Sequence, residues 1–190
     1  MNRLRRRAGV ALIGTGSACI AVLHVLHGMW ADLAPWQHRL SEYANGRAGV
    51  LMVAAFTSLG LALLTLAPVV SPTGRAMRAA LRIGGIGLLL AGVFRTGATE
   101  AGATADALHG VTSTAATVAM IAAVVRSRRR VLIALAVLLG AVSPVAHGTV
   151  VAGVAQRLLW AVLLIWCVVV ARAGGTGISA PSARSETIDA

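Results

Sequence analysis

Three side chains suited to acid–base chemistry follow one another along one apolar stretch of the chain: Asp106, His109 and Ser113. Their spacings of three and four residues would place them on one face of a helix. An imidazole gains and loses protons near neutral pH, and a nearby carboxylate can orient it or exchange a proton with it. If the protein is an enzyme, we expect His109 to act as the acid or base, with Glu100 or Asp106 as its carboxylic partner.

A second group of polar and aromatic side chains could bind a substrate. Arg157 lies shortly after the start of an apolar stretch, where a charge is costly without a partner. It could clamp an anionic headgroup, pair with Glu100 or Asp106, or extend to lipid phosphate. Trp160 and Trp30 would add an apolar wall, although such aromatics also form belts at membrane interfaces. The candidate binding residues are Arg157, Gln156, Trp160, His24, His147, Arg95, Trp30 and Tyr43.

A metal site is the alternative interpretation of the histidines. His24, His109 and His147 each lie roughly 9–10 Å from the middle of their apolar stretch at a helical rise of about 1.5 Å per residue. Three histidines at one level could hold a metal ion for hydrolysis. No pair among them has a spacing typical of metal ligands, and Cys19 and Cys167 lie singly in apolar stretches. The sequence therefore predicts no metal and no other cofactor.

The chain that carries these residues is too apolar for a soluble domain. Of its 190 residues, 57% are hydrophobic and 12% are charged, whereas a soluble domain has roughly 25% charged residues. The apolar residues form six stretches, each of about the length that crosses roughly 30 Å of hydrocarbon as a helix. We therefore predict an all-α, polytopic integral membrane protein with six transmembrane helices in three hairpins. The predicted spans are residues 8–29, 48–70, 78–97, 106–125, 131–149 and 154–172.

The last two predicted spans are separated only by a weak turn signal. Residues 131–171 are apolar almost throughout, and a single helix of that length would be far too long for a bilayer. Pro144, Gly148 and Gly153 are residues typical of turns. We therefore expect a tight hairpin in this range.

The arginines predict the orientation in the membrane. With the amino terminus in the cytoplasm, 13 of the 17 arginines fall on the cytoplasmic side, and Arg39, Arg47, Arg95 and Arg157 fall on the other. Because cytoplasmic loops carry an excess of positive charge, we expect both termini in the cytoplasm. The five histidines and four of the six acids then lie toward the outer leaflet.

Composition also bears on domains, partners and origin. One transmembrane domain, residues 1–172, is predicted to precede a disordered cytoplasmic tail, residues 173–190, which is rich in small polar residues. The net charge of +11 would indicate nucleic-acid binding in a soluble domain, but most arginines lie in short loops between apolar stretches. No nucleic-acid partner is expected. The chain has no lysine, and it is rich in alanine, glycine and valine. This composition is typical of proteins from GC-rich bacterial genomes. We therefore expect the protein in a bacterial inner membrane.

Several short motifs give the chain a resemblance to a known family. They are Leu40-Ser41-Glu42-Tyr43, Gly92-Val93-Phe94-Arg95, Glu100, Leu108-His109-Gly110 and Gly153-Val154-Ala155-Gln156-Arg157. In this order and spacing, over residues 10–172, the chain resembles the bacterial membrane proteins grouped as domain of unknown function 998. That family often has a proline and then an aspartate after the third span, where this chain has Gly97-Ala98-Thr99-Glu100. The resemblance implies six helices and an outward-facing polar cluster, and it implies no established activity.

Three functions fit these observations. In the first, a polar pocket at the outer leaflet binds a lipid-like or isoprenoid small molecule, and the protein has an accessory or sensing role. In the second, the protein is a membrane-embedded enzyme that acts on such a molecule by acid–base chemistry, as a hydrolase or a terpene cyclase whose aromatic side chains stabilise a carbocation. A small permease is the third, although no inverted repeat is visible. The expected partners are membrane lipids and the lipid-like or isoprenoid molecule, and self-association into a homo-oligomer stays open.

Overall fold

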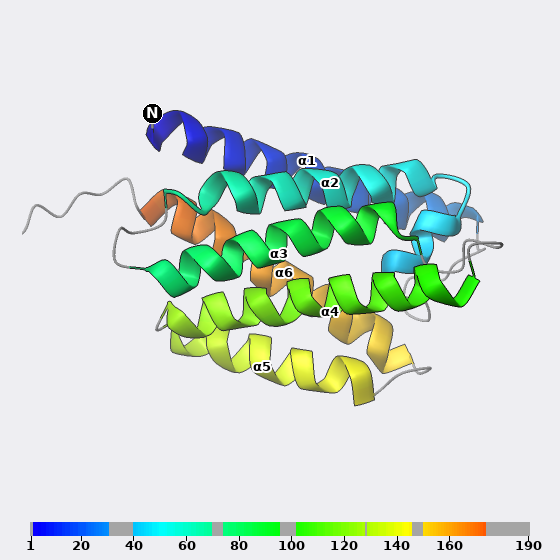
Figure 1. The fold of residues 1–190 in the computed structure, drawn as a ribbon. Coiled ribbons are helices and arrows are strands. Elements are labelled where there is room, and N and C mark those ends of the chain that lie inside the picture. Colours follow the sequence, from blue (N-terminus) through cyan, green and yellow to red (C-terminus); the bar gives the residue numbers. More distant parts are fainter. Residues whose placement is uncertain are drawn as a thin grey trace, which may run out of the picture.

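The computed structural model of the chain describes residues 2–30, 40–69, 74–95, 102–127, 129–145 and 150–173. Within this part the chain is all-α, with six α-helices and one 3-10 helix (Figure 1). The elements are α1 (Asn2–Trp30), the 3-10 helix η1 (Leu40–Asn45), α2 (Gly49–Leu66), α3 (Arg75–Val93), α4 (Gly102–Arg126), α5 (Arg130–Val145) and α6 (Val150–Ala173).

Five of the described helices are long and apolar enough to cross a membrane: α1, α2, α3, α4 and α6. The protein is therefore a multi-pass membrane protein. The remaining helix, α5, is described over residues 130–145 of the range in which a span is predicted at 131–149. Its 16 residues extend about 24 Å, less than the roughly 30 Å of bilayer hydrocarbon. Residues 146–149 lie outside the described part of the chain, so a sixth span stays a prediction.

Apolar side chains cover the outer faces of the helices. Each α-helix exposes large hydrophobic side chains, among them Val25, Leu61, Ile83, Val111, Leu138 and Ile165. Water does not solvate such a surface favourably, whereas lipid tails do. The backbone polar groups of each helix are meanwhile satisfied within the helix, which is the condition for crossing hydrocarbon.

The first four helices pack in chain order, α1 on α2, α2 on α3 and α3 on α4 (Figure 1). Glycines allow two of these helix pairs to approach closely. A Cβ atom built on Gly85 of α3 would lie 2.8 Å from the carbonyl oxygen of Gly60 in α2, and a Cβ atom on Gly87 would lie 2.8 Å from that of Thr112 in α4. Small residues at these positions let backbones meet where lipid competes for larger apolar side chains.

The last two helices form a separate pair. Helix α5 ends at Val145, α6 begins at Val150, and the two pack against each other. Helix α6 also contacts α1, α4 and η1, and its Trp166 is fully buried in the core. We call the end of the bundle where α1 ends, η1 lies and α4 and α6 begin the η1 end (Figure 1). The polar side chains described below lie toward that end.

Candidate functional site

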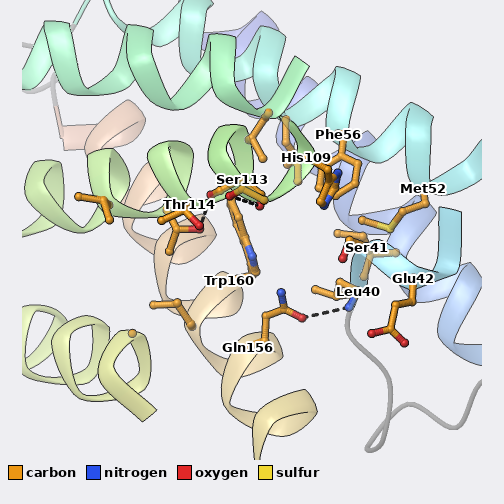
Figure 2. A pocket seen from close by; sticks show the side chains of 18 of the residues that line it. Leu40, Ser41, Glu42, Met52, Phe56, His109, Ser113, Thr114, Gln156 and Trp160 are labelled. Carbon is orange, nitrogen blue, oxygen red and sulfur yellow. Dashed lines mark hydrogen bonds between the residues drawn. The ribbon is translucent and has the colours of Figure 1, made fainter. Parts of the chain in front are cut away.

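A cavity of about 710 Å³ extends inward from the η1 end of the bundle. Its lining comes from η1 and from all six α-helices, with α4 and α6 on facing sides (Figure 2). The volume lies within the range of about 300–1,000 Å³ that is typical of small-molecule sites. The lining residues are Ile20, Leu40, Ser41, Glu42, Met52, Phe56, Leu59, Leu88, Asp106, His109, Gly110, Ser113, Thr114, Thr117, Val118, Ile121, Gly140, Gln156, Leu159 and Trp160.

The cavity changes from polar to apolar along its length. On α4, the polar residues Asp106, His109 and Ser113 come first, and Val118 and Ile121 come last. From Asp106 to Ile121 the helix rises about 22 Å. A molecule that fills the cavity would therefore meet polar groups at one end and an apolar wall at the other.

His109 is the most buried polar side chain of the lining, with 4% of its surface exposed. Its Nδ1 atom lies 2.6 Å from the carbonyl oxygen of Phe94 and 3.0 Å from that of Ala91, at the end of α3. Carbonyl oxygens only accept hydrogen bonds, so Nδ1 carries a proton, and in the neutral form of the ring the lone pair is on Nε2. Among the described residues, none is hydrogen-bonded to Nε2. The ring also contacts Phe56 edge to face, with centroids 6.1 Å apart.

Hydroxyl groups continue this face of α4 inward. The Ser113 hydroxyl donates to the carbonyl oxygen of Gly110 at 3.2 Å, and the Thr117 hydroxyl donates to that of Ser113 at 2.9 Å. Their protons are thus directed at the helix backbone. These hydroxyl oxygens can therefore accept hydrogen bonds from a molecule in the cavity.

The element η1 lines the cavity and is tied to α6. The backbone N–H of Leu40 donates to Oε1 of Gln156 at 3.0 Å (Figure 2). Ser41 and Glu42, which follow Leu40, line the cavity on this side. Glu42 therefore adds a second carboxylate to the lining besides Asp106.

A second polar group, here called the Tyr43 cluster, joins α1, η1 and α6 and consists of His24, His27, Tyr43 and Arg157. Arg157 donates from Nε to Nε2 of His24 at 2.6 Å and from Nη2 to the Tyr43 hydroxyl at 2.8 Å. It also donates from Nη1 to the carbonyl oxygen of Gly153 at 2.9 Å. The buried Tyr43 ring stacks on His27, with centroids 4.5 Å apart.

The protonation of His24 follows from its two hydrogen bonds. Its Nδ1 atom lies 2.7 Å from the carbonyl oxygen of Ile20 and so must donate, while Nε2 accepts from Arg157. His24 is therefore the neutral Nδ1–H tautomer in this arrangement. A neutral imidazole and a phenol hydroxyl stabilise the guanidinium here by accepting charge-assisted hydrogen bonds.

A family model for proteins of unknown function, DUF998, matches residues 12–173. The chain belongs to the DUF998 family. No curated protein and no solved structure gives a significant match to it.

The predicted site residues of this DUF998 chain divide between two places. The cavity lining contains Asp106, His109, Gln156 and Trp160, whereas His24, Tyr43 and Arg157 belong to the Tyr43 cluster and are not among the described lining residues. Arg95 is exposed just beyond α3 and does not line the cavity. Glu100, His147 and the side chain of Trp30 lie outside what the structure describes.

The structure describes two of the three alternative metal ligands, His24 and His109. Among the residues it describes, no group of three His, Cys, Asp or Glu side chains could hold a metal ion. His24 and His109 are engaged separately, with Arg157 and with the end of α3. The third candidate ligand, His147, lies outside the described residues.

Most of the lining of the DUF998 chain was not among the predicted site residues, and its polar part includes Ser41, Glu42, Thr114 and Thr117. Ser41 and Glu42 belong to the family-like Leu40–Tyr43 motif, so the motif was a signal of their importance. Thr117 follows Ser113 by four residues and continues the helical face that begins at Asp106. His27, which stacks on Tyr43, was likewise not predicted as a site residue.

Proposed function

We propose that this DUF998 protein binds a lipid-like or isoprenoid small molecule in the cavity and has an accessory or sensing role. The observation that carries the proposal is the polar-to-apolar gradient of the lining. Asp106 and His109 lie at the η1 end, and Ile121 and Leu159 lie further in. An amphiphile has the same gradient, with a polar headgroup and an apolar chain, and it would bury both ends against matching surfaces.

The proposal includes a position in the membrane. The protein spans the inner membrane of a bacterium six times with both termini in the cytoplasm, and the η1 end faces the outer leaflet. The excess of arginine at the opposite end supports this orientation. The headgroup would then lie near the outer interface, and the chain would run inward parallel to lipid tails.

Photolabelling in a bilayer tests the proposal. The full-length protein is placed in lipid nanodiscs with dodecyl probes that carry a diazirine at the far end of the chain and an alcohol, amine or phosphate headgroup. We expect saturable labelling of lining residues such as Ile121 and Leu159, in excess over the lipid-facing Ile83 and Ile165. If all three probes label only the outer faces, without saturation, the cavity does not bind such molecules and the proposal is wrong.

Acid–base catalysis on the bound molecule is a second candidate, which one observation favours. His109 lines the cavity with its Nδ1 atom bonded to the end of α3, which in the neutral ring leaves Nε2 as the basic atom, and Asp106 precedes it by one helical turn in the same lining. A fixed, neutral imidazole can accept a proton from a substrate and return it. Lipid profiles decide between the candidates. A deletion strain that accumulates a new lipid, which wild-type protein removes and His109→Asn does not, would favour the enzyme over the binding protein.

A further inference from the structure

Three arginines lie near the start of α3, at the end of the bundle opposite η1 (Figure 1). We call Arg75, Arg78 and Arg82 the α3 arginine stripe. Their spacings of three and four residues place them on one face of the helix. Like charges at such spacings repel one another, and α3 contains no carboxylate that could offset them. An anion bound to this face would therefore stabilise it.

Arg82 lies at a depth where a charge needs a partner. It follows Arg75, the first residue of α3, by seven residues, which is about 10 Å along the helix. The Arg82 side chain is exposed on the outside of the bundle, beside the exposed and apolar Ile83. Among the described residues, none accepts a hydrogen bond from Arg82. A guanidinium at this depth is costly when it has no counter-ion.

Arg157 provides a comparison within the same chain. It also follows the first residue of its helix, Val150, by seven residues. Its guanidinium donates to two side chains of other elements and to one backbone carbonyl oxygen. The protein thus provides acceptors for an arginine inside the bundle, whereas the exposed Arg82 faces the surrounding membrane. A lipid can provide the acceptor there.

The face of α3 that carries the arginines continues as an apolar surface. Ile86, Leu90 and Val93 follow Arg82 at spacings of four, four and three residues, and all three side chains are exposed. Helical side chains are tilted toward the amino terminus of their helix, so Arg82 extends back toward Arg75 and away from these apolar groups. The face is therefore cationic near the start of α3 and apolar along the rest, which matches a lipid headgroup and its acyl chain.

We infer that the outer face of α3 binds a phospholipid with a net negative charge. The α3 arginine stripe holds the phosphate, because guanidinium groups donate paired hydrogen bonds to phosphate oxygens. An acyl chain lies along Ile86 and Leu90. A zwitterionic headgroup binds less well, since its ammonium group is repelled by the three arginines. This site lies outside the cavity and does not depend on the proposed function.

Lipid titration tests the inference. The full-length protein in a nonionic detergent is titrated with phosphatidylglycerol or with phosphatidylcholine of the same acyl chains, and its melting temperature is measured. We expect phosphatidylglycerol to stabilise the wild type at the lower concentration. Arg82→Gln should raise the concentration of phosphatidylglycerol required about fivefold, which is the typical contribution of one arginine near anionic lipid. Arg5→Gln is the matched control, since it removes the same charge from an exposed position on α1 at the same end of the bundle.

The source of the phosphate is tested separately. Inorganic phosphate and glycerol 3-phosphate should not raise the melting temperature, because neither has a chain to cover Ile86 and Leu90. Stabilisation by these soluble anions equal to that by the lipid would overturn the inference. Equal concentrations of the two lipids at half-maximal stabilisation, or equal effects of Arg82→Gln and Arg5→Gln, would also overturn it, since the arginines would then act only through the net charge of this end.

A photolabelling measurement keeps the test independent of the variants. Phosphatidylglycerol that carries a diazirine in the middle of one acyl chain is added to wild-type protein in phosphatidylcholine nanodiscs. We expect saturable labelling of Ile86 and Leu90, in excess over the equally lipid-facing Ile165 of α6. Labelling of all three residues in proportion to the amount of probe, without saturation, would show that α3 has no such site. Neither result bears on whether the cavity binds an amphiphile.

Discussion

At the scale of single residues, Arg157 shows how a charge is accommodated in an apolar helix. The sequence predicted that it would need a partner and named carboxylates, Glu100 or Asp106, as candidates. The structure shows neutral groups among its partners, His24 and Tyr43, which come from positions 133 and 114 residues away in the chain. Sequence spacing within one helix says nothing about contacts between helices, so these partners could not be inferred from periodicity.

Replacing Arg157 should destabilise the protein. Arg157→Leu removes the donor that the Tyr43 hydroxyl and Nε2 of His24 accept from, and each buried acceptor left unsatisfied costs about 1–3 kcal/mol. We expect a lower melting temperature in detergent and a lower yield, with partial recovery in Arg157→Lys, which lacks the planar guanidinium. Arg95→Leu, at an exposed position, is the control. Equal melting temperatures for Arg157→Leu and wild type would contradict this role.

The Nδ1 atom of His109 has a structural role and its Nε2 atom a proposed chemical role, and two variants can separate these roles. The amide nitrogen of an asparagine can take the place of Nδ1 and donate to Phe94, but it provides nothing in the place of Nε2. We expect His109→Asn to keep a melting temperature close to wild type and to lose probe labelling or the strain phenotype. His109→Ala loses the donor as well and should be less stable. A His109→Asn variant that is as active as wild type would show that Nε2 has no role at the site.

At the scale of elements, periodicity predicted the helices better than their ends. A helix lies in each of the six predicted ranges, because long apolar stretches bounded by charge or glycine leave few alternatives. Of the predicted span at 131–149, the structure describes α5 as far as Val145, and residues 146–149 lie outside the described part of the chain, so this boundary stays a prediction. The 3-10 helix η1 was not predicted, since six residues show no period and tertiary bonds to Gln156 and Arg157 hold them in place.

The contact between α2 and α3 depends on glycine. A Cβ atom at Gly85 would lie 2.8 Å from the carbonyl oxygen of Gly60, a rigid backbone atom that cannot move aside cheaply. Gly85→Ala should therefore lower the free energy of unfolding by about 1–3 kcal/mol, which is typical of overpacking. The melting temperature should fall with it. Gly14→Ala is the matched control, since a Cβ atom there meets nothing within 4 Å. If both variants melt alike, the helices separate without cost and the close contact does not stabilise the bundle.

At the scale of the whole molecule, the arginine distribution predicts the orientation. A fluorescent protein fused after Ala190 should fluoresce in the cytoplasm, and an alkaline phosphatase inserted near Gly102, at the η1 end, should be active. The fluorescent protein reports the cytoplasmic side of the membrane, and the phosphatase is active only on the opposite side. An inactive phosphatase together with a dark fusion would place the η1 end in the cytoplasm and the cavity at the inner leaflet.

The whole-molecule arrangement also explains how far the site could be predicted. The face of α4 that carries Asp106 and His109 followed from spacing alone, because polar groups on a membrane helix turn toward the bundle interior. On α6, Gln156 and Trp160 line the same cavity, whereas the neighbouring Arg157 is not among the described lining residues. Which of these side chains faces the cavity depends on the rotation of α6 about its axis. This rotation is set by packing against α5, α1 and η1, and a single sequence does not encode it in any local pattern.

The central claim is that the cavity between α4 and α6 holds an amphiphile, and blocking that space tests it most directly. Thr114 lines the cavity, and Val111 is exposed on the same helix outside the lining. Thr114→Trp therefore places a bulky side chain inside the cavity, and Val111→Trp places the same side chain outside it. In nanodiscs with the diazirine probes, we predict that Thr114→Trp loses the saturable labelling of Ile121 and Leu159 while Val111→Trp keeps it. Undiminished labelling of these two residues in the Thr114→Trp variant would contradict the account.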